Sequence, residues 1–89
     1  MAQLGADVDQ LDTIVRDFRT ANSDLTAMIA KLDGSVNAAW WQGPDADQFR
    51  GDWSQQFKSQ LNNVAAALDN TATAVAAQAQ QQRDASGAG

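Results

Sequence analysis

The side chains that could carry acid–base or metal chemistry in this chain are all aspartates. Its 89 residues include eleven acidic positions, every one of them Asp, and no His, Cys or Tyr. General acid–base catalysis would therefore need a carboxylate tuned to the working pH. Asp45 and Asp47 form a close pair, but both fall where a helix would begin, and the helix dipole explains them there. The sequence predicts no enzyme, no catalytic residue, no cofactor and no metal site.

The charge pattern argues against nucleic acid and membrane as partners. The formal net charge is -5, with only six basic residues, so no basic stripe is available to displace counterions from phosphates. Amphipathic helices that insert into membranes carry Lys and Arg on their polar faces, whereas these faces are acidic or amide-rich. No segment reaches the apolar length of a membrane span. The first residues also lack the basic and apolar regions of a cleaved secretory signal, so any export would need another route.

The first half of the chain has the periodicity of a long amphipathic helix. Apolar residues recur in alternating steps of four and three, which predicts a helix over about residues 4–40, roughly 54 Å long. One position of the stripe is polar, Asn22, which is either a tolerated polar residue or a contact that fixes the register of a bundle. The stripe consists of Leu4, Val8, Leu11, Val15, Phe18, Leu25, Ile29, Leu32, Val36 and Ala39.

A turn is predicted over residues 41–44. Gly43 can adopt a backbone conformation that ends a helix, and Pro44 has no amide hydrogen to lose at a first helical position. Asp45 and Asp47 would then lie in the first turn of a second helix. Trp40 and Trp41 come just before this turn, and adjacent helical residues point in different directions, so both cannot enter one core. One of them is therefore a candidate anchor for a partner.

A second helix is predicted over about residues 45–82. Its stripe drifts between Phe49 and Leu61, where three consecutive steps of four occur, and it becomes rich in Ala from Val64 onward. Residues 84–89 are predicted to form a disordered tail. The chain is then a single domain over residues 1–89.

Folding the chain back at the turn gives an all-α hairpin of two long antiparallel helices. The fold-back sets Leu32 opposite Trp53, and it sets Gly34 opposite Gly51, which predicts a close helix approach. Two such hairpins could bury their broad apolar stripes as a four-helix-bundle dimer. The aromatic residues near the turn can also be interpreted as a plug that seals one end of the hairpin. The predicted core and dimer contacts are Leu11, Phe18, Leu25, Phe49, Trp53, Phe57 and Leu61.

The residues around the turn resemble a known family. Trp41-Gln42-Gly43 is a Trp-x-Gly motif near the middle of a chain of slightly under a hundred residues, and Ala46, Phe49 and Trp53 follow it. The chain is similar over essentially its whole length to the WXG family, the early secreted antigen-like small proteins of type VII (ESX-type) secretion systems. Trp-x-Gly alone is a weak motif, and the specificity comes from its combination with the length, the central position and the downstream residues.

The resemblance implies a helical hairpin that pairs with itself or with a related protein of the family. Such proteins are exported folded, without a cleaved signal peptide, by an ATPase-driven membrane machine in mycobacteria, other actinobacteria and Gram-positive bacteria. The expected destination is the medium or the cell surface. The expected partners are a second hairpin and the secretion ATPase. The family motif corresponds to Trp41 and Gly43, and the predicted turn and recognition motif of this chain also includes Trp40 and Pro44.

The chain departs from the family at the export signal. Members that carry the signal have Tyr-x-x-x-Asp/Glu shortly after the second helix, and the nearest match here is Gln80-x-x-x-Asp84. In the family the signal lies near the turn of the partner, because the two hairpins pack antiparallel. Either a partner supplies the signal or the chain uses a variant of it. The alternative function is an intracellular adaptor or chaperone of the same fold that is not itself exported, and a membrane-lytic hairpin is a third, less favoured hypothesis.

Overall fold

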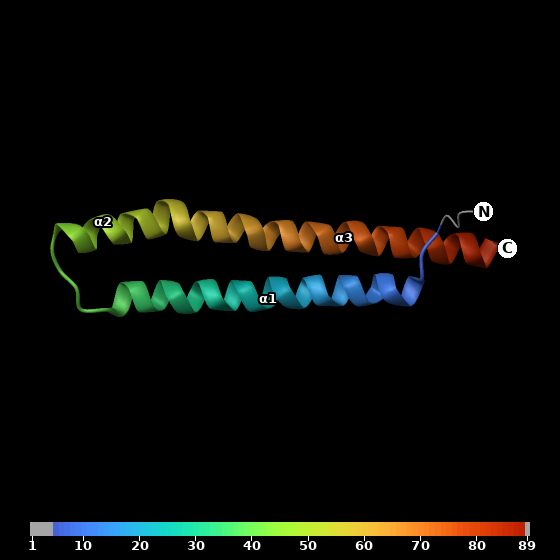
Figure 1. Ribbon diagram of the computed structural model, residues 1–89, viewed down its shortest axis with the longest axis horizontal. Helices are drawn as coiled ribbons and strands as arrows, with labels where there is room; N and C mark the ends of the chain where they lie inside the picture. The colour runs from blue at the N-terminus through green and yellow to red at the C-terminus, as the bar shows by residue number, and fades with distance from the viewer. Residues whose placement is uncertain (1–4, 89) are drawn as a thin grey trace.

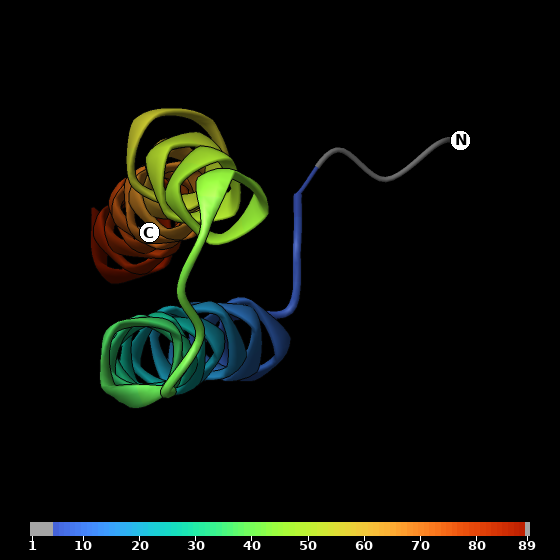
Figure 2. The same ribbon diagram turned by 90° about the vertical axis from the view of Figure 1, so that its left-hand side faces the viewer.

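The computed structural model describes residues 5–88, which form two long antiparallel arms joined by a short loop (Figure 1). The first arm is α1 (Val8–Ala38), and the return arm consists of α2 (Pro44–Asp52), the π-helix η1 (Trp53–Phe57) and α3 (Lys58–Ala88). No strand occurs in the described range, so the predicted all-α hairpin is confirmed there. The rod measures 68 × 19 × 18 Å. Seen end-on from the turn, the arms lie side by side as a single layer (Figure 2).

Helix α1 begins later than predicted. Gly5 has a φ of 149°, outside the helical region, and Asp7 caps the helix instead. The Asp7 carboxylate accepts hydrogen bonds from the backbone N–H groups of Asp9 at 2.9 Å and Gln10 at 3.2 Å. Such a cap satisfies amides that have no partner within the helix. The predicted start near residue 4 is therefore wrong for residues 5–7, and residues 1–4 lie outside the described range.

Helix α3 continues beyond its predicted end at residue 82 and reaches Ala88. The prediction of disorder from residue 84 is therefore wrong as far as residue 88, and Gly89 lies outside the described range. The Gln80 amide donates a hydrogen bond to the Asp84 carboxylate at 3.0 Å, and Arg83 forms an ion pair with Asp12 of α1. These contacts, added to the high helix propensity of Ala and Gln, continue the helix.

The packed seam between the arms is built largely from small residues. Among the described residues, only two of the six buried apolar side chains are large, Ile29 and Trp53. The other four are Ala46, Ala65, Ala72 and Ala79. Alanine allows the helices to approach closely but removes little apolar area from water. The hairpin therefore has a thin core for its length.

The π-helix keeps the buried positions of the return arm on one face. They recur every seven residues, except between Trp53 and Ala65, which are twelve residues apart. About three α-helical turns take eleven residues, so this interval contains one extra residue. In η1 the Lys58 N–H bonds to the carbonyl oxygen of Trp53, an i→i+5 pattern that accommodates one extra residue. The drift of the stripe noted in the sequence is thus absorbed locally, and Leu61 remains half-buried.

Hydrogen bonds between the arms fix their register. The Asn22 amide donates to the carbonyl oxygen of Ala65 at 2.6 Å, so Asn22 makes a register contact within the hairpin. Near the turn, the Trp53 indole donates to the Asp33 carboxylate, one residue from the predicted pairing with Leu32. The predicted close approach at Gly34 and Gly51 is wrong, because a Cβ added at either glycine would meet nothing within 4 Å.

One broad side of the hairpin carries uncovered apolar side chains. In each arm, an exposed residue directly precedes a buried one, as Met28 precedes Ile29 and Val64 precedes Ala65. Both exposed stripes are therefore rotated in the same sense from the seam, and in antiparallel helices this brings them to the same side. We call this side the apolar face. Its exposed members are Ile14, Met28, Leu32, Phe57 and Val64.

Candidate recognition site at the hairpin turn

The turn is formed by residues 39–43, and its geometry explains the glycine and the proline. Gly43 has φ 124° and ψ 174°, a region that is essentially restricted to glycine. It is the N-cap of α2 and lies five residues beyond the end of α1, rather than directly ending that helix as the sequence suggested. Pro44 is the first residue of α2, and Asp45 and Asp47 lie in its first turn, as predicted.

Arg50 holds the turn in place, and sequence reasoning missed it. Its Nε donates to the carbonyl oxygen of Val36 at 3.1 Å, its Nη2 to that of Ala39 at 2.7 Å, and its Nη1 to that of Trp41 at 2.8 Å. The last turn of α1 contains no basic residue, and Ala39 leaves the helix with an extended ψ of 133°. Carbonyl groups at a helix end need partners from elsewhere, and that requirement is the signal that could have identified Arg50.

The two tryptophans before Gly43 have different environments. The side chain of Trp40 is 87% exposed, whereas that of Trp41 is 44% exposed. The Trp41 ring packs against Phe49, with ring centroids 5.7 Å apart and planes inclined by 44°. Such a tilted aromatic pair is favourable. Neither indole is buried. Trp40 is almost fully exposed, whereas the half-exposed Trp41 beside it is supported by Phe49.

Trp53 forms the buried part of the same end. Its side chain is 7% exposed, and its indole Nε1 donates to Asp33 Oδ1 at 2.9 Å. The other carboxylate oxygen of Asp33 lies 3.2 Å from Lys58 Nζ. The hydrogen bond from Trp53 and then that from Lys58 hold the pKa of Asp33 below its usual value. The aromatic plug is therefore reduced to Trp53, because Phe49 and Phe57 are exposed.

The other predicted contacts lie along the rod. Leu11, Phe18, Leu25 and Leu61 are half-buried at the seam, so their outer sides border the apolar face. Phe57 belongs to that face and is 44% exposed.

Gln80 and Asp84 lie far from the turn. They belong to the last part of α3, whereas the turn is at the opposite end of the 68 Å rod (Figure 1). Both side chains are exposed, and they are hydrogen-bonded to one another. One chain therefore does not bring Trp41 and the Gln80–Asp84 pair together.

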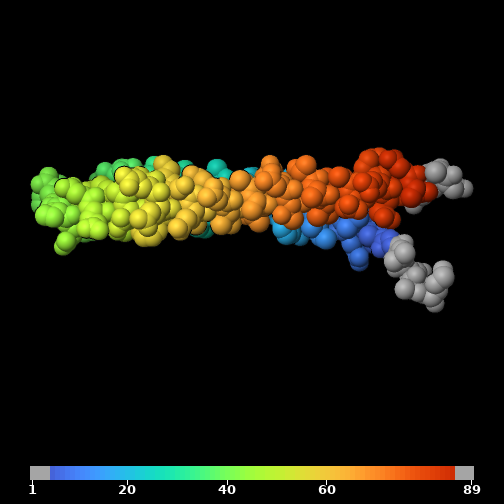
Figure 3. All heavy atoms as spheres, turned by 90° about the horizontal axis from the view of Figure 1, so that it is seen from above, coloured from blue at the N-terminus to red at the C-terminus, as the bar shows by residue number. Residues whose placement is uncertain are grey.

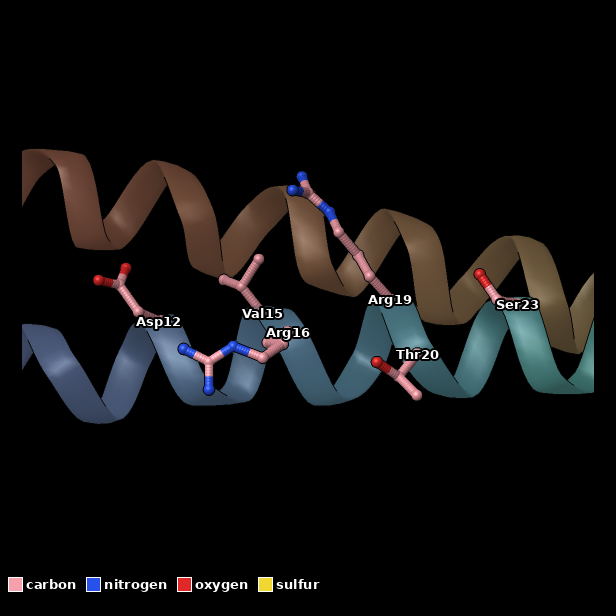
Figure 4. A pocket seen from close by; sticks show the side chains of 6 residues that line it. All are labelled: Asp12, Val15, Arg16, Arg19, Thr20 and Ser23. Atoms are coloured by element: carbon pink, nitrogen blue, oxygen red, sulfur yellow. The ribbon is translucent and has the colours of Figure 1, made fainter.

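A shallow groove on α1 does not form a second site. It is lined by Asp12, Val15, Arg16, Arg19, Thr20 and Ser23. Figure 4 shows Arg19 reaching toward α3 while Arg16 and Thr20 lie over α1 itself, so the polar groups do not converge. Within residues 5–88, no group of three or more potential metal ligands is found. No helix in that range combines the length and hydropathy needed to cross a membrane.

Comparison of the chain with models of protein families, with curated proteins and with solved structures gives no match.

Proposed function

We propose that this chain is a non-enzymatic substrate or partner of a type VII secretion system, exported folded as a dimer of hairpins. The observation that carries the proposal is the position of Trp41-Gln42-Gly43 at the connection of two long antiparallel helices. The resemblance to the WXG family rests on this motif in combination with the chain length, the central position and the downstream Ala46, Phe49 and Trp53. It implies the hairpin and the export route. The proposed roles are export signalling, co-export of a partner and effector action outside the cell.

Pairing of hairpins is supported by the apolar face. Ile14, Met28 and Leu32 are each at least 39% exposed, and Phe57 and Val64 of the return arm lie on the same side. Full burial of one such side chain contributes about 1.5–3 kcal/mol. Stacking two apolar faces would add a shared core to a seam that consists mainly of alanines, and the product is a four-helix bundle. A related hairpin with a similar face would serve as well as a second copy.

Pairing can be tested by placing a charge on each side of α1. Met28→Lys puts an ammonium group on the apolar face, whereas Ala30→Lys puts one about 200° away around the helix. We expect size-exclusion chromatography with light scattering to give twice the chain mass for the unmodified protein and for A30K, and the single-chain mass for M28K. A folded unmodified protein that is monomeric alone and with every related hairpin would contradict the pairing.

Export can be tested in a producing strain with and without its secretion ATPase. We expect the chain in the culture supernatant only when the ATPase is present. Trp41→Ala should reduce the exported amount while leaving the helix content by circular dichroism unchanged. Retention of the unmodified chain in the cell under both conditions would exclude the export proposal and favour the intracellular adaptor.

A further inference from the structure

The loop between the arms has few backbone hydrogen bonds of its own. Within residues 39–43, the backbone–backbone hydrogen bonds outside the helices are those from the Ala39 N–H to the carbonyl oxygen of Ser35 and from the Asp47 N–H to the carbonyl oxygen of Gly43. The loop spans five residues, and ordering a residue costs about 1–2 kcal/mol in backbone entropy. A connection of this kind would sample many arrangements unless side chains restrain it.

Arg50 supplies that restraint through all three nitrogen atoms of its guanidinium group. Its acceptors, the carbonyl groups of Val36, Ala39 and Trp41, span the end of α1 and most of the loop. Hydrogen bonds from a charged donor are roughly twice as strong as neutral ones. The guanidinium is planar and rigid, so three fixed acceptors define one loop geometry. Arg50 itself is anchored in α2 and is half-buried, unlike an arginine on a solvated helix face.

The restrained loop displays an apolar side chain that is almost fully exposed. Trp40 is 87% exposed and lies between Ala39 and Trp41, the two loop residues whose carbonyl groups Arg50 binds. A partner that binds a loop already held in one geometry does not have to order it, which raises affinity. Tryptophan is also among the residues that most often dominate binding energy.

We propose that Arg50 is the positioning residue of the turn, residues 39–43. It holds this turn so that Trp40 is presented to the protein that recognises the turn during export. This inference rests on the proposed function, because it assumes that the turn is recognised during export. It goes beyond that function by assigning the presentation to Arg50 and the contact to Trp40. Lysine cannot replace Arg50, because an ammonium group is a point charge without the planar fork.

The experiment compares Arg50→Lys with Arg16→Lys, a matched exchange at an exposed arginine of α1. The first readout is ¹⁵N relaxation of the purified, folded protein. We expect order parameters of residues 39–43 and of the Trp40 indole near the rigid value of about 0.85 in the unmodified protein and in R16K, and below about 0.6 in R50K. Helix amides should be unchanged in all three. An R50K loop as rigid as that of the unmodified protein would overturn the proposal.

The second readout is the exported amount in a strain with the secretion ATPase. We expect R50K to be exported about tenfold less than the unmodified protein, and R16K to be exported equally well. Trp40→Ala changes an exposed side chain and should lower export to a similar extent without loosening the loop. Undiminished export of W40A, or of R50K with a loosened loop, would overturn the presenting role.

The two readouts separate this inference from the proposed function. If the unmodified chain is never exported, the proposed function fails and the presenting role fails with it. The relaxation data on the purified protein would still decide whether Arg50 orders the loop. If R50K fails to fold, W40A still decides whether the displayed indole is used.

Discussion

The two ends of the rod are stabilised in different ways. At the turn, Arg50 binds three carbonyl groups, and Trp53 is buried against Asp33. At the open end, the arms meet through Ala72 and Ala79, and the Arg83–Asp12 ion pair is half-exposed. The space-filling view shows the return arm running the whole length of the rod, from the turn to the open end (Figure 3). One continuous arm is therefore held to its neighbour by different chemistry at its two ends.

The difference between the two sets of contacts shows which end of the rod specifies the fold. Contacts at the turn end are directional, since each needs one side chain in one geometry, and they lie beside two uncommon backbone conformations, those of Gly43 and η1. Contacts at the open end depend on helix propensity and small side chains, which many sequences could provide. Substitutions at the turn end should therefore cost far more than equivalent ones elsewhere.

The largest effect is expected from Trp53→Ala. The substitution empties a buried position and leaves the Asp33 carboxylate without its indole donor, so we expect a loss of about 3–5 kcal/mol in the free energy of unfolding. Urea unfolding followed by circular dichroism measures this loss. Trp40→Ala is the matched control at an exposed tryptophan and should change stability by less than about 0.5 kcal/mol. Equal losses in the two variants would contradict the contrast between the buried and the displayed indole.

Intermediate effects on stability, opposite in sign to one another, are expected from substitutions at two glycines. Gly43→Ala forces a side chain into a conformation with φ 124°, which should destabilise the fold by roughly 1–3 kcal/mol. Gly34→Ala adds a Cβ in open space within α1 and should stabilise the fold by about 0.5–1 kcal/mol. Thermal unfolding of both variants gives the comparison. A fold that tolerates G43A better than G34A would show that the glycine conformation is not required.

The smallest effect concerns Asp33 and acid stability. Its pKa is lowered in the folded state by Trp53 and Lys58, so its ionised form stabilises the fold above its unfolded pKa of about 3.8. That contribution is fully present at pH 7 and is lost as the pH falls through the lowered pKa. Asp33→Asn should therefore unfold at a lower urea concentration at pH 7, and the difference from the unmodified protein should shrink below pH 4. A difference that stays constant from pH 7 to pH 3 would contradict this role.

Much of the fold could be predicted from the sequence because the underlying signals are periodic or local. The apolar stripe indicated both arms, and Gly43-Pro44 marked the start of α2 to within one residue. The fold-back placed Trp53 one residue from its observed partner, Asp33. These inferences needed only helix geometry and the chemistry of glycine and proline.

The remaining features depend on contacts between distant residues, which a periodicity does not reveal. Nothing in the pattern joined Arg50 to the carbonyl group of Val36 fourteen residues earlier. The drift of the stripe after Phe49 was visible, but a single extra residue can be absorbed by a bend, by loss of contact or by a π-helix. The end of α3 was misplaced because Ala- and Gln-rich segments fit either a helix or a tail until the other arm is present.

The narrowness of the rod has a consequence for passage through an opening. A compact domain of this length would have a radius of gyration of about 12 Å, whereas the hairpin has 19.9 Å with its two short dimensions at 19 and 18 Å. When it moves along its long axis, the folded hairpin needs an opening only as wide as two helices side by side. Stacking a second hairpin on the apolar face widens only one of those dimensions. A folded pair would thus pass end-on through a slot that would stop a globule of the same mass.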